Sequence, residues 1–360
     1  MRCFNFNPGP AAMPLPVLEA LQRDLVDYQG RGLSVLEMSH RSTDFTDIAN
    51  KAEADLRSLL AIPERYSVLF MQGGASTQFA LTVSNLDETG QVAFANSGYW
   101  SRKAIDVASM TTHVEELVSA QTQPLIAIPA AHQWREAGKA SYLHVTDNET
   151  IDGVRLNDLP DSDVPVVADM SSSILSRPLD MERYGLIYAG AQKNIGPAGI
   201  TVVIVRDDLL ERSAQRKHLA PVFSYAAMHA AGSMLNTPPT FAWYSAALVF
   251  QWLLDEGGLH EIAQRNERQA AMVYAAIDES EIYINKVHPQ NRSVMNLPFQ
   301  LTRPEWEAAF LRGSIERGLI GLKGHKSVGG LRASLYNAVT DEAVEALVEY
   351  LHDFARNPQA

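Results

Sequence analysis

LIYAGAQKNIGPAGITVVIVR, residues 186–206, places a lysine and two glycines between two apolar runs, the first of which contains a third glycine. Both runs, 186–191 and 200–206, are apolar on successive residues, which is typical of strands buried on both faces of a sheet. Lysine is usually a solvated surface residue, so Lys193 could simply occupy an exposed turn. The glycines and the proline around it favour a different interpretation, in which the backbone approaches a ligand closely.

The same alternation of apolar runs and helical periodicity extends outward from this stretch, from residue 15 to about residue 255. It predicts an α/β fold whose large domain holds a mainly parallel sheet between helices. The other expected strands are 66–72, 91–96, 139–146 and 164–170, and the expected helices are 14–29, 45–60, 76–86 and 241–254.

Asp255-Glu256-Gly257-Gly258 marks a boundary to a smaller α+β C-terminal domain. We therefore expect a large domain over 15–255 and a small one over 256–360. In the small domain we expect helices at 259–278, 303–317 and 341–356, a strand within 293–301, and a strand pair around 318–325 and 330–337.

The charge of the chain limits its partners. Its 42 acidic and 30 basic side chains give a formal net charge of −12. Such a surface repels phosphate backbones and anionic headgroups, so we expect neither nucleic acid nor membrane as a partner. The single cysteine, Cys3, rules out an intramolecular disulfide and a zinc cluster, and no metal site is predicted. With no signal-peptide pattern at the start of the sequence, we expect a cytoplasmic protein.

Candidate site residues follow the strands, because open α/β sheets bind ligands outside the carboxyl ends of their strands. Each group has an ordinary alternative: a glycine turn, a tryptophan in an interdomain core, a plain turn, or an aspartate that caps a helix. In chain order the groups are Gly73-Gly74-Ala75-Ser76-Thr77, Ser97-Gly98-Tyr99-Trp100, Asp147-Asn148-Glu149-Thr150, Asp169, and Gln192-Lys193.

Taken together, these strand ends suit one ligand. The small residues up to Ser76 leave helix amides free for a phosphate, and Trp100 could stack on a flat ring. Asp169 could pair with a protonated ring nitrogen. Lys193, partly desolvated, could attack an aldehyde as a neutral amine. A phosphate, a flat ring, a ring nitrogen and an aldehyde describe pyridoxal 5'-phosphate.

Six stretches carry a family resemblance. The sequence resembles the phosphoserine aminotransferase family, in the aspartate-aminotransferase fold group, over essentially its whole length. The resemblance implies a homodimer with active sites at the interface, with residues 1–14 near the small domain and the active site. The stretches are FNFNPGPA (4–11), SVLEMSHRS (34–42), ADMSSSILSRP (168–178), YAGAQKNIGPAG (188–199), NTPPTFAWY (236–244) and LKGHKSVGGLRASLYNA (322–338).

The activity implied is a ping-pong transamination that uses pyridoxal phosphate. L-glutamate would give its amino group to 3-phosphohydroxypyruvate, yielding O-phospho-L-serine and 2-oxoglutarate in serine biosynthesis. A side activity on 4-phosphohydroxy-L-threonine, in pyridoxine biosynthesis, is implied as well.

The resemblance also assigns roles to residues. For the cofactor, Lys193 resembles the lysine that binds it covalently, Asp169 the partner of its ring nitrogen, Trp100 the stacking residue and Thr150 the partner of its 3-hydroxyl. Its phosphate would be held by Ala75, Ser76 and Gln192, and by Asn236 and Thr237 of the other subunit. For the substrate, Arg332 resembles the arginine that grips the α-carboxylate, and the cationic patch for the far anion is His40, Arg41, His325 and Lys326.

Some interpretations remain open. His40 and Arg41 could lie in a surface turn, with Ser39 capping the next helix. Lys326 stands where relatives are expected to have arginine, and the two differ in binding phosphate through two parallel hydrogen bonds. The loop at Ala75 and Ser76 also lacks the arginine that some relatives place there.

Rival functions share some of these features. They are an aminotransferase for small neutral amino acids, a cysteine desulfurase, a non-catalytic cofactor-binding protein, and a nucleotide-binding protein. A desulfurase needs a cysteine in the later half of the chain, where Cys3 does not lie. Neutral substrates would not call for the cationic patch, and Gly73-Gly74 would have to serve as the nucleotide loop.

Overall fold

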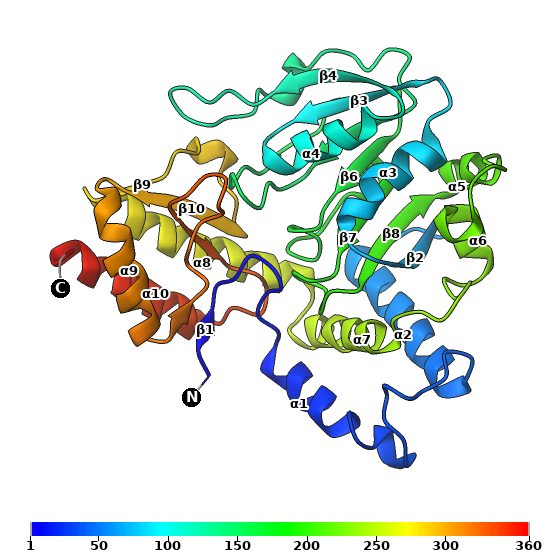
Figure 1. Cartoon of the computed structure of the whole chain (residues 1–360), viewed down its shortest axis with the longest axis horizontal. Coiled ribbons are helices and arrows are strands. Elements are labelled where there is room, and N and C mark those ends of the chain that lie inside the picture. Colours follow the sequence, from blue (N-terminus) through cyan, green and yellow to red (C-terminus); the bar gives the residue numbers. More distant parts are fainter. Residues whose placement is uncertain (1, 359–360) are drawn as a thin grey trace.

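Seven strands of the large domain form one sheet in the order β2-β8-β7-β6-β5-β3-β4 (Figure 1). Only β8 runs antiparallel to its neighbours, so the prediction of a mainly parallel sheet is confirmed. The computed structural model describes residues 2–358. Its strands are β1 (Phe4–Asn5), β2 (Tyr66–Gln72), β3 (Gln91–Asn96), β4 (His113–Ser119), β5 (Leu143–Thr146), β6 (Val166–Asp169), β7 (Leu186–Gly190), β8 (Ile200–Arg206), β9 (Tyr283–Ile284), β10 (Asn296–Leu301), β11 (Leu319–Ile320) and β12 (Leu331–Ser334).

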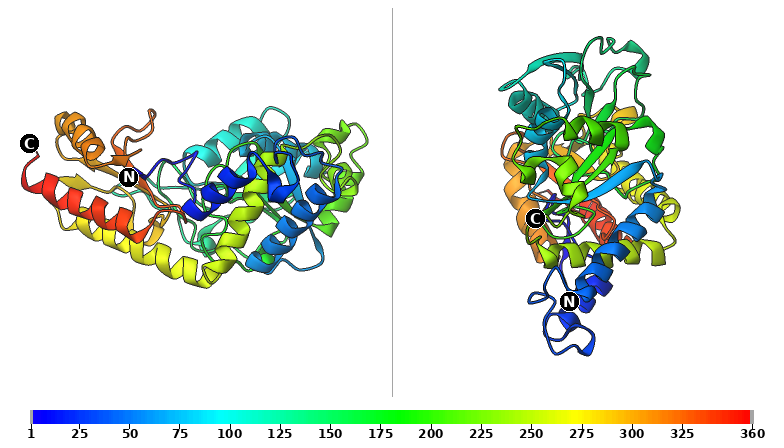
Figure 2. Two further views of the ribbon diagram at one scale, coloured as in Figure 1. Left: turned by 90° about the horizontal axis from the view of Figure 1, so that it is seen from below. Right: turned by 90° about the vertical axis from the view of Figure 1, so that its right-hand side faces the viewer.

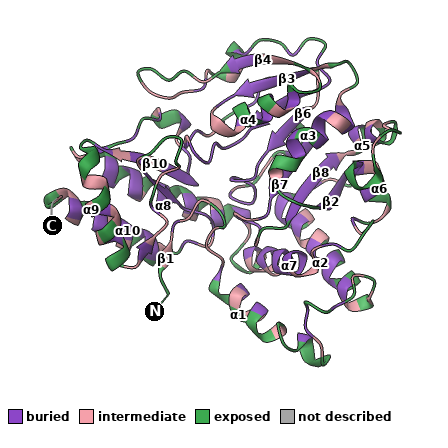
Figure 3. Cartoon of the chain, viewed as in Figure 1, coloured by how far each residue is buried: buried purple, intermediate pink, exposed green. Residues whose placement is uncertain are grey.

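Helices cover both faces of this sheet, and its central strands are buried along their length (Figure 3). In β2, Val68 and Phe70 join the core beneath α2 and α7, whereas Leu69 and Met71 join the opposite core beneath α3, α4 and α5. The helices are α1 (Leu15–Asp24), α2 (Thr43–Leu60), α3 (Ala75–Leu86), α4 (Tyr99–Ala108), α5 (Asp207–Ala214), α6 (Tyr225–Ala230), α7 (Thr240–Asp255), α8 (Leu259–Asp278), α9 (Glu307–Glu316) and α10 (Asp341–Arg356).

The small domain is a three-stranded antiparallel sheet, β12-β10-β9, packed against α8 and α10. Helix α8 runs from the large domain into the small one (Figure 2), since its start joins the large core and its end joins the small core.

The expected strand pair of 318–325 and 330–337 is wrong. β11 pairs with β1 near the N-terminus, β12 pairs with β10, and a single bridge, Lys323 to Leu331, joins the two segments.

Three further expectations need correction. The loop expected after β3 is a helix, α4, because carboxylates from another segment hold its first turn. The helix expected over 14–29 ends at Asp24, and a short 3-10 turn follows at Tyr28–Gly30. The strand β4 was not predicted, because this edge strand, HVEELVS, is only partly buried and carries charges. Along residues 2–358 no helix is both long and apolar enough to cross a membrane.

A buried hydrogen-bond network ties the small domain to the large one. Asn148, beyond β5, donates to Asn296 Oδ1 at 2.9 Å. Asn296 in turn donates to Ser334 Oγ at 3.0 Å and to the Tyr336 hydroxyl at 3.2 Å. The Tyr336 hydroxyl donates to the carbonyl of Pro8 at 3.0 Å. Four segments distant in sequence therefore meet through polar groups that burial obliges to pair.

Gly153 packs where the two domains touch. Its φ is +69°, and a Cβ there would lie 2.2 Å from Pro298 Cδ of β10. Gly138 has a similar φ of +57° with no atom within 4 Å of a Cβ, so it serves as a matched control. Gly138→Ala should cost about 1–2 kcal/mol of unfolding free energy for its left-handed backbone. Gly153→Ala should cost about 1–3 kcal/mol more, because it also overpacks the interface.

Urea denaturation of both variants, followed by circular dichroism, measures this difference. Equal losses for the two alanine variants would contradict a tight contact at Gly153.

Candidate active site

A cavity of about 310 Å³ opens at the carboxyl edge of the large sheet. It brings together residues from five separate strand ends and from the small domain, as the topology of parallel strands requires. Its wall includes nine of the residues that the sequence singled out: Ala75, Ser76, Trp100, Thr150, Asp169, Gln192, Lys193, His325 and Arg332.

Lys193 lies in a tight loop that follows β7, two residues after Ala191. The backbone N–H groups of Lys193 and Gly196 both donate to the carbonyl of Ala191, at 2.7 and 2.8 Å. The side chain crosses the cavity, and its Nζ donates to Thr150 Oγ1 at 2.6 Å. The loop therefore holds the amine inside the cavity and close to the segment that follows β5.

Burial lowers the pKa of Lys193 to about 8, against the attraction of Asp169, which raises it. The nearby guanidinium of Arg332 lowers the pKa further. A desolvated amine beside a cation loses its proton more readily, so a useful fraction is neutral near physiological pH. Only the neutral form can attack an aldehyde.

Asp169 ends β6 and is 6% exposed. Ser171 donates to its Oδ1 twice, from the backbone N at 2.8 Å and from Oγ at 2.6 Å. Asp169 thus closes a turn after the strand and does not cap a helix. Burial raises the pKa of Asp169, whereas the hydrogen bonds from Ser171 and the charge of Lys193 lower it. Because both bonds reach Oδ1, Oδ2 is the oxygen available to a cationic partner in the cavity.

The start of α3 forms the end of the cavity beyond β2. Gly74 precedes the helix with no side chain to cap it, so the first amides of α3 have no side-chain acceptor at the helix start. Gly190, the last residue of β7, lets this turn come close: a Cβ there would lie 2.8 Å from Gln192 Oε1 and 3.3 Å from the N of Ala75. Free amides at a helix start form a ready site for a phosphate.

Arg332 of β12 brings a buried cation to the cavity from the small domain. Its side chain is held by one hydrogen bond, from Nη1 to the carbonyl of Thr150 at 3.1 Å. Its Nε is buried without a partner among the described residues, and burial lowers the pKa of the guanidinium. Such a group favours a carboxylate as ligand, since an unpaired buried charge is costly.

Trp100 lines the cavity from the first turn of α4, with its indole Nε1 buried and unpaired among residues 2–358. It does not belong to the hydrophobic core of the small domain, and its ring packs against Tyr99 at 5.3 Å. An aromatic side chain on the cavity wall can stack on a flat ligand.

Five predicted residues lie away from the cavity in this chain. Lys326 is exposed on the loop after His325. His40 and Arg41 lie between α1 and α2, in a segment that projects from the large domain (Figure 1). Asn236 and Thr237 are exposed and accept hydrogen bonds from Gln72 at the end of β2, at 2.8 and 3.0 Å. The alternative role for Ser39 is wrong, because Ser42 caps α2 by accepting from the N of Phe45.

Several residues at the site were not given a role from the sequence. Pro8 and Gly9 line the cavity from the N-terminal segment, and Ala11 N donates to the carbonyl of Gln192 at 2.9 Å. Glu149 and Asp152 hold the start of α4. The glycine and prolines of FNFNPGPA were a visible signal of close packing, but nothing in the pattern pointed to Asp152.

The donor set fits pyridoxal phosphate. The cavity offers an amine with a lowered pKa, a buried carboxylate with a free oxygen, an aromatic wall and a helix start with uncapped amides. Its volume, about 310 Å³, lies in the range of small-molecule sites. Each of these groups would suit a different part of the cofactor, and they come from separate elements of the fold.

Known proteins are similar to this chain along nearly its whole length. The family described as Aminotransferase class-V matches residues 3–347. A phosphoserine aminotransferase of Pseudomonas syringae pv. syringae is 51% identical over 358 residues, covering 99% of this chain and 98% of the relative.

Solved structures of phosphoserine aminotransferases are also similar to this chain. The phosphoserine aminotransferase of Bacillus circulans subsp. alkalophilus has a TM-score of 0.95 at 44% identity, with 99% of each chain covered. A second, studied for radiation damage of its Schiff base, has a TM-score of 0.96 at 41% identity, again with 99% of each chain covered.

The rate at which Lys193 captures pyridoxal phosphate should rise with pH through about 8, because its depressed pKa sets the fraction of neutral amine. An ordinary lysine would show this rise near 10.5. Stopped-flow absorbance of the cofactor-free chain measures the profile, and Lys193→Ala corrects for exposed lysines. A midpoint near the ordinary value would refute the desolvated amine.

Proposed function

The chain belongs to the class-V aminotransferase family, and we propose that within it the protein acts as a phosphoserine aminotransferase dependent on pyridoxal phosphate. It transfers the amino group of L-glutamate to 3-phosphohydroxypyruvate, and O-phospho-L-serine and 2-oxoglutarate are the products. The observation that carries the proposal is Lys193, held in a cavity with Asp169, Trp100 and Arg332, in a chain similar to phosphoserine aminotransferases along its length.

Pyridoxal phosphate supplies, when bound, an electron-withdrawing ring that stabilises negative charge at the α-carbon of the amino acid. The residues that would hold it are Lys193 at the aldehyde, Asp169 at the ring nitrogen, Trp100 at the ring face and Thr150 at the 3-hydroxyl. Ala75, Ser76 and Gln192 would hold the phosphate, with the amides at the start of α3.

Lys193 has a second task once a substrate has displaced it from the aldehyde. Its Nζ, with a lowered pKa, can accept the proton from the substrate α-carbon and would deliver it to the cofactor carbon that carried the aldehyde. Thr150 Oγ1, 2.6 Å from Nζ in this structure, keeps the amine on that side of the cavity. Asp169, at the buried end of the site, would pair with the ring nitrogen and hold a proton on it.

Arg332 binds the α-carboxylate of both amino acids, because its buried guanidinium otherwise has too few acceptors. The fork geometry of arginine suits a carboxylate held through two hydrogen bonds. The N-terminal residues Pro8 and Gly9 cover the lysine loop and limit the access of water to it. Orientation by Arg332 and exclusion of water by this cover both favour transfer over side reactions.

The far end of the substrate requires a site for two different anions, a phosphate and the γ-carboxylate of glutamate. His325 stands on the cavity wall, and Lys326 follows it on the exposed loop. His40 and Arg41 complete the cationic patch from the partner subunit in this proposal. Mobile positive side chains can pair with either anion, whereas a neutral pocket would leave both unpaired.

A homodimer follows from the same proposal. The segment that carries His40 and Arg41 projects from the large domain and exposes apolar side chains, among them Val26 at 80% and Leu36 at 57%. Near Asn236, Leu235 is 40% exposed. Exposed apolar side chains on a projecting segment favour a protein interface. In the dimer Asn236 and Thr237 would reach the cofactor phosphate of the other subunit.

Residues 15–255 serve as the cofactor-binding domain, 256–360 as the small domain, and 1–14 as a cover between them, supported by the two separate cores and by the β1–β11 pairing. The same cationic patch would accept 4-phosphohydroxy-L-threonine. The chain works in the cytoplasm, a reducing compartment that suits a chain with a single cysteine.

The purified protein with pyridoxal phosphate should show a visible absorption band of the lysine-bound cofactor. L-glutamate and O-phospho-L-serine should each bleach it, because both can be bound by the cationic patch and Arg332. Lys193→Ala should lack this behaviour, and L-alanine should bleach the wild-type band far less. A wild-type chain that stays colourless, or that responds to alanine as well as to phosphoserine, would contradict the proposal.

Mixing two inactive homodimers tests the shared site. Arg41→Ala and Lys193→Ala should each lose activity, because each removes one part of every site. After subunit exchange, half of the dimers are mixed and one of their two sites is complete, so about a quarter of the activity should return. A mixture that remains inactive after verified exchange would show that Arg41 serves its own subunit.

A further inference from the structure

Three backbone N–H groups begin α4, and all of them are bound by carboxylates from a different segment. Asp152 Oδ2 accepts from the N of Tyr99 at 2.7 Å. Glu149 accepts from the N of Trp100 at 2.8 Å and from the N of Ser101 at 2.9 Å. The residue before the helix is Gly98, which has no side chain to offer. The usual local cap is therefore replaced by two acids that follow β5.

Space at this helix start is reserved for the two carboxylates. A Cβ on Gly98 would lie 2.5 Å from Asp152 Oδ2 and 2.9 Å from Glu149 Cδ. The φ of Gly98, 167°, is open to any residue, so packing and not backbone strain requires glycine here. Ser97 Oγ adds a fourth hydrogen bond, to Glu149 Oε1 at 3.2 Å.

Glu149 is fully buried and lies outside the cavity, and its negative charge is the smallest of the influences on the pKa of Lys193, which it raises. Burial and the neighbouring Asp152 raise its pKa to about 7, whereas the hydrogen bonds from Ser101 and Trp100 lower it. A carboxylate is costly to bury, so its presence here points to a function beyond filling space. The positive end of the helix dipole offsets part of that cost.

The position of Glu149 in the chain links the two walls of the site. Its neighbour Thr150 accepts the hydrogen bond from Lys193 Nζ at 2.6 Å, while Glu149 itself holds the backbone of Trp100. One dipeptide therefore fixes the aromatic wall relative to the amine. A ring bound between them needs this separation to be constant, because stacking depends on the distance between planes.

Asp152 acts in the same way one residue earlier in α4. It holds Tyr99, whose ring lies 5.4 Å from the imidazole of His325. Burial raises the pKa of Asp152, and the charge of His325 lowers it, so the two side chains also interact electrostatically. Through Tyr99, Asp152 thus sets where the loop of the small domain carries His325.

We infer that Glu149 and Asp152 are positioning residues, Glu149 for the Trp100 wall that meets the cofactor and Asp152 for the Tyr99–His325 contact that meets the far anion of the substrate. The inference rests on the proposed function, because it assigns one carboxylate of the cap to cofactor binding and the other to substrate binding. It predicts that removing one carboxylate affects one ligand and spares the other.

Glu149→Gln is the first test. The glutamine amide turns its NH₂ towards one of the two backbone N–H groups, so one bond of the cap is lost at nearly constant volume. The Kd of pyridoxal phosphate, measured by tryptophan quenching on the full chain, should rise about tenfold, the effect of losing one hydrogen bond to a charged group. A Kd within twofold of the wild type would overturn the role of Glu149.

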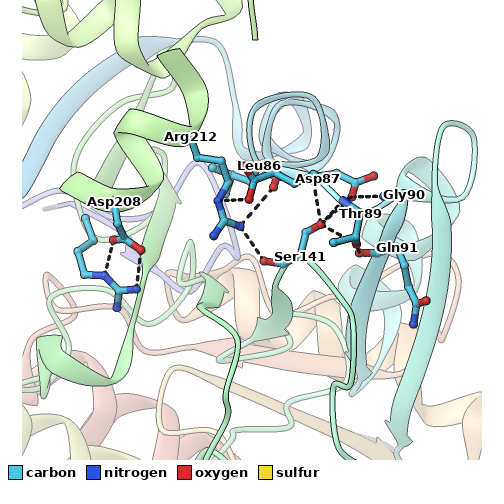
Figure 4. Close-up of polar contacts among 10 residues, drawn as sticks. Leu86, Asp87, Thr89, Gly90, Gln91, Ser141, Asp208 and Arg212 are labelled. Carbon is cyan, nitrogen blue, oxygen red and sulfur yellow. Dashed lines mark hydrogen bonds and ion pairs between the residues drawn. The ribbon is translucent and has the colours of Figure 1, made fainter. Parts of the chain in front are cut away.

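Asp87→Asn is the matched control. Asp87 lies at the opposite end of α3 from the cavity and accepts from Ser141 Oγ at 2.8 Å and from the N of Gly90 at 3.0 Å (Figure 4). Its loss should lower the thermal midpoint as Glu149→Gln does, without changing the Kd of the cofactor. An equal change of Kd in both variants would mean that Glu149 is merely structural.

Asp152→Asn is the second variant, and it keeps the inference testable if Glu149→Gln does not fold. The KM for O-phospho-L-serine should rise about fivefold or more, with kcat and the Kd of pyridoxal phosphate changed less than twofold, as expected when uniform substrate binding is lost. An unchanged KM, or a weakened cofactor Kd, would overturn the role of Asp152. A wild-type chain that binds no pyridoxal phosphate would instead refute the proposed function itself.

Discussion

The hydrogen bond from Lys193 Nζ to Thr150 Oγ1, inside a wall of buried strands, is the contact around which the rest of the site is arranged. An amine in this place has lost much of its water, and burial lowers its pKa to about 8. The sheet supplies the rigid position, because β7 delivers the lysine and β5 delivers the threonine at the same edge. Asp169, between them on β6, returns negative charge to the site and keeps the amine from losing its proton entirely.

The segment 147–153 connects several parts of the molecule that surround the cavity. It binds the start of α4 through Glu149, the lysine through Thr150, and the small domain through Asn148 and Gly153. It is irregular in conformation, yet almost every residue in it is buried, so its polar groups are obliged to find partners. Those obligatory hydrogen bonds join β5, α4 and β10 into one frame around the cavity.

Much of the site could be predicted because the cofactor demands recognisable groups at strand ends. Lys193, Asp169 and the glycine turn before Ser76 each follow an apolar run that reads as a buried strand. The first turn of α4 could not be predicted, because its cap comes from Glu149 and Asp152, about fifty residues later. The pairing of β11 with β1 was likewise hidden, since two-residue strands carry no periodic signal of their own.

Local residue patterns determined the α/β class, most of the strands and helices, and the chemistry that the strand ends can perform, because burial and cofactor chemistry restrict residue types locally. Tertiary structure alone decided which groups share a wall. It placed Arg332 of β12 against Thr150, set Oδ2 of Asp169 free by turning Oδ1 towards Ser171, and left His40 and Arg41 outside the cavity of their own chain. Such choices depend on distances between residues far apart in sequence, and those distances are fixed only when the sheet, the small domain and the N-terminal segment pack together.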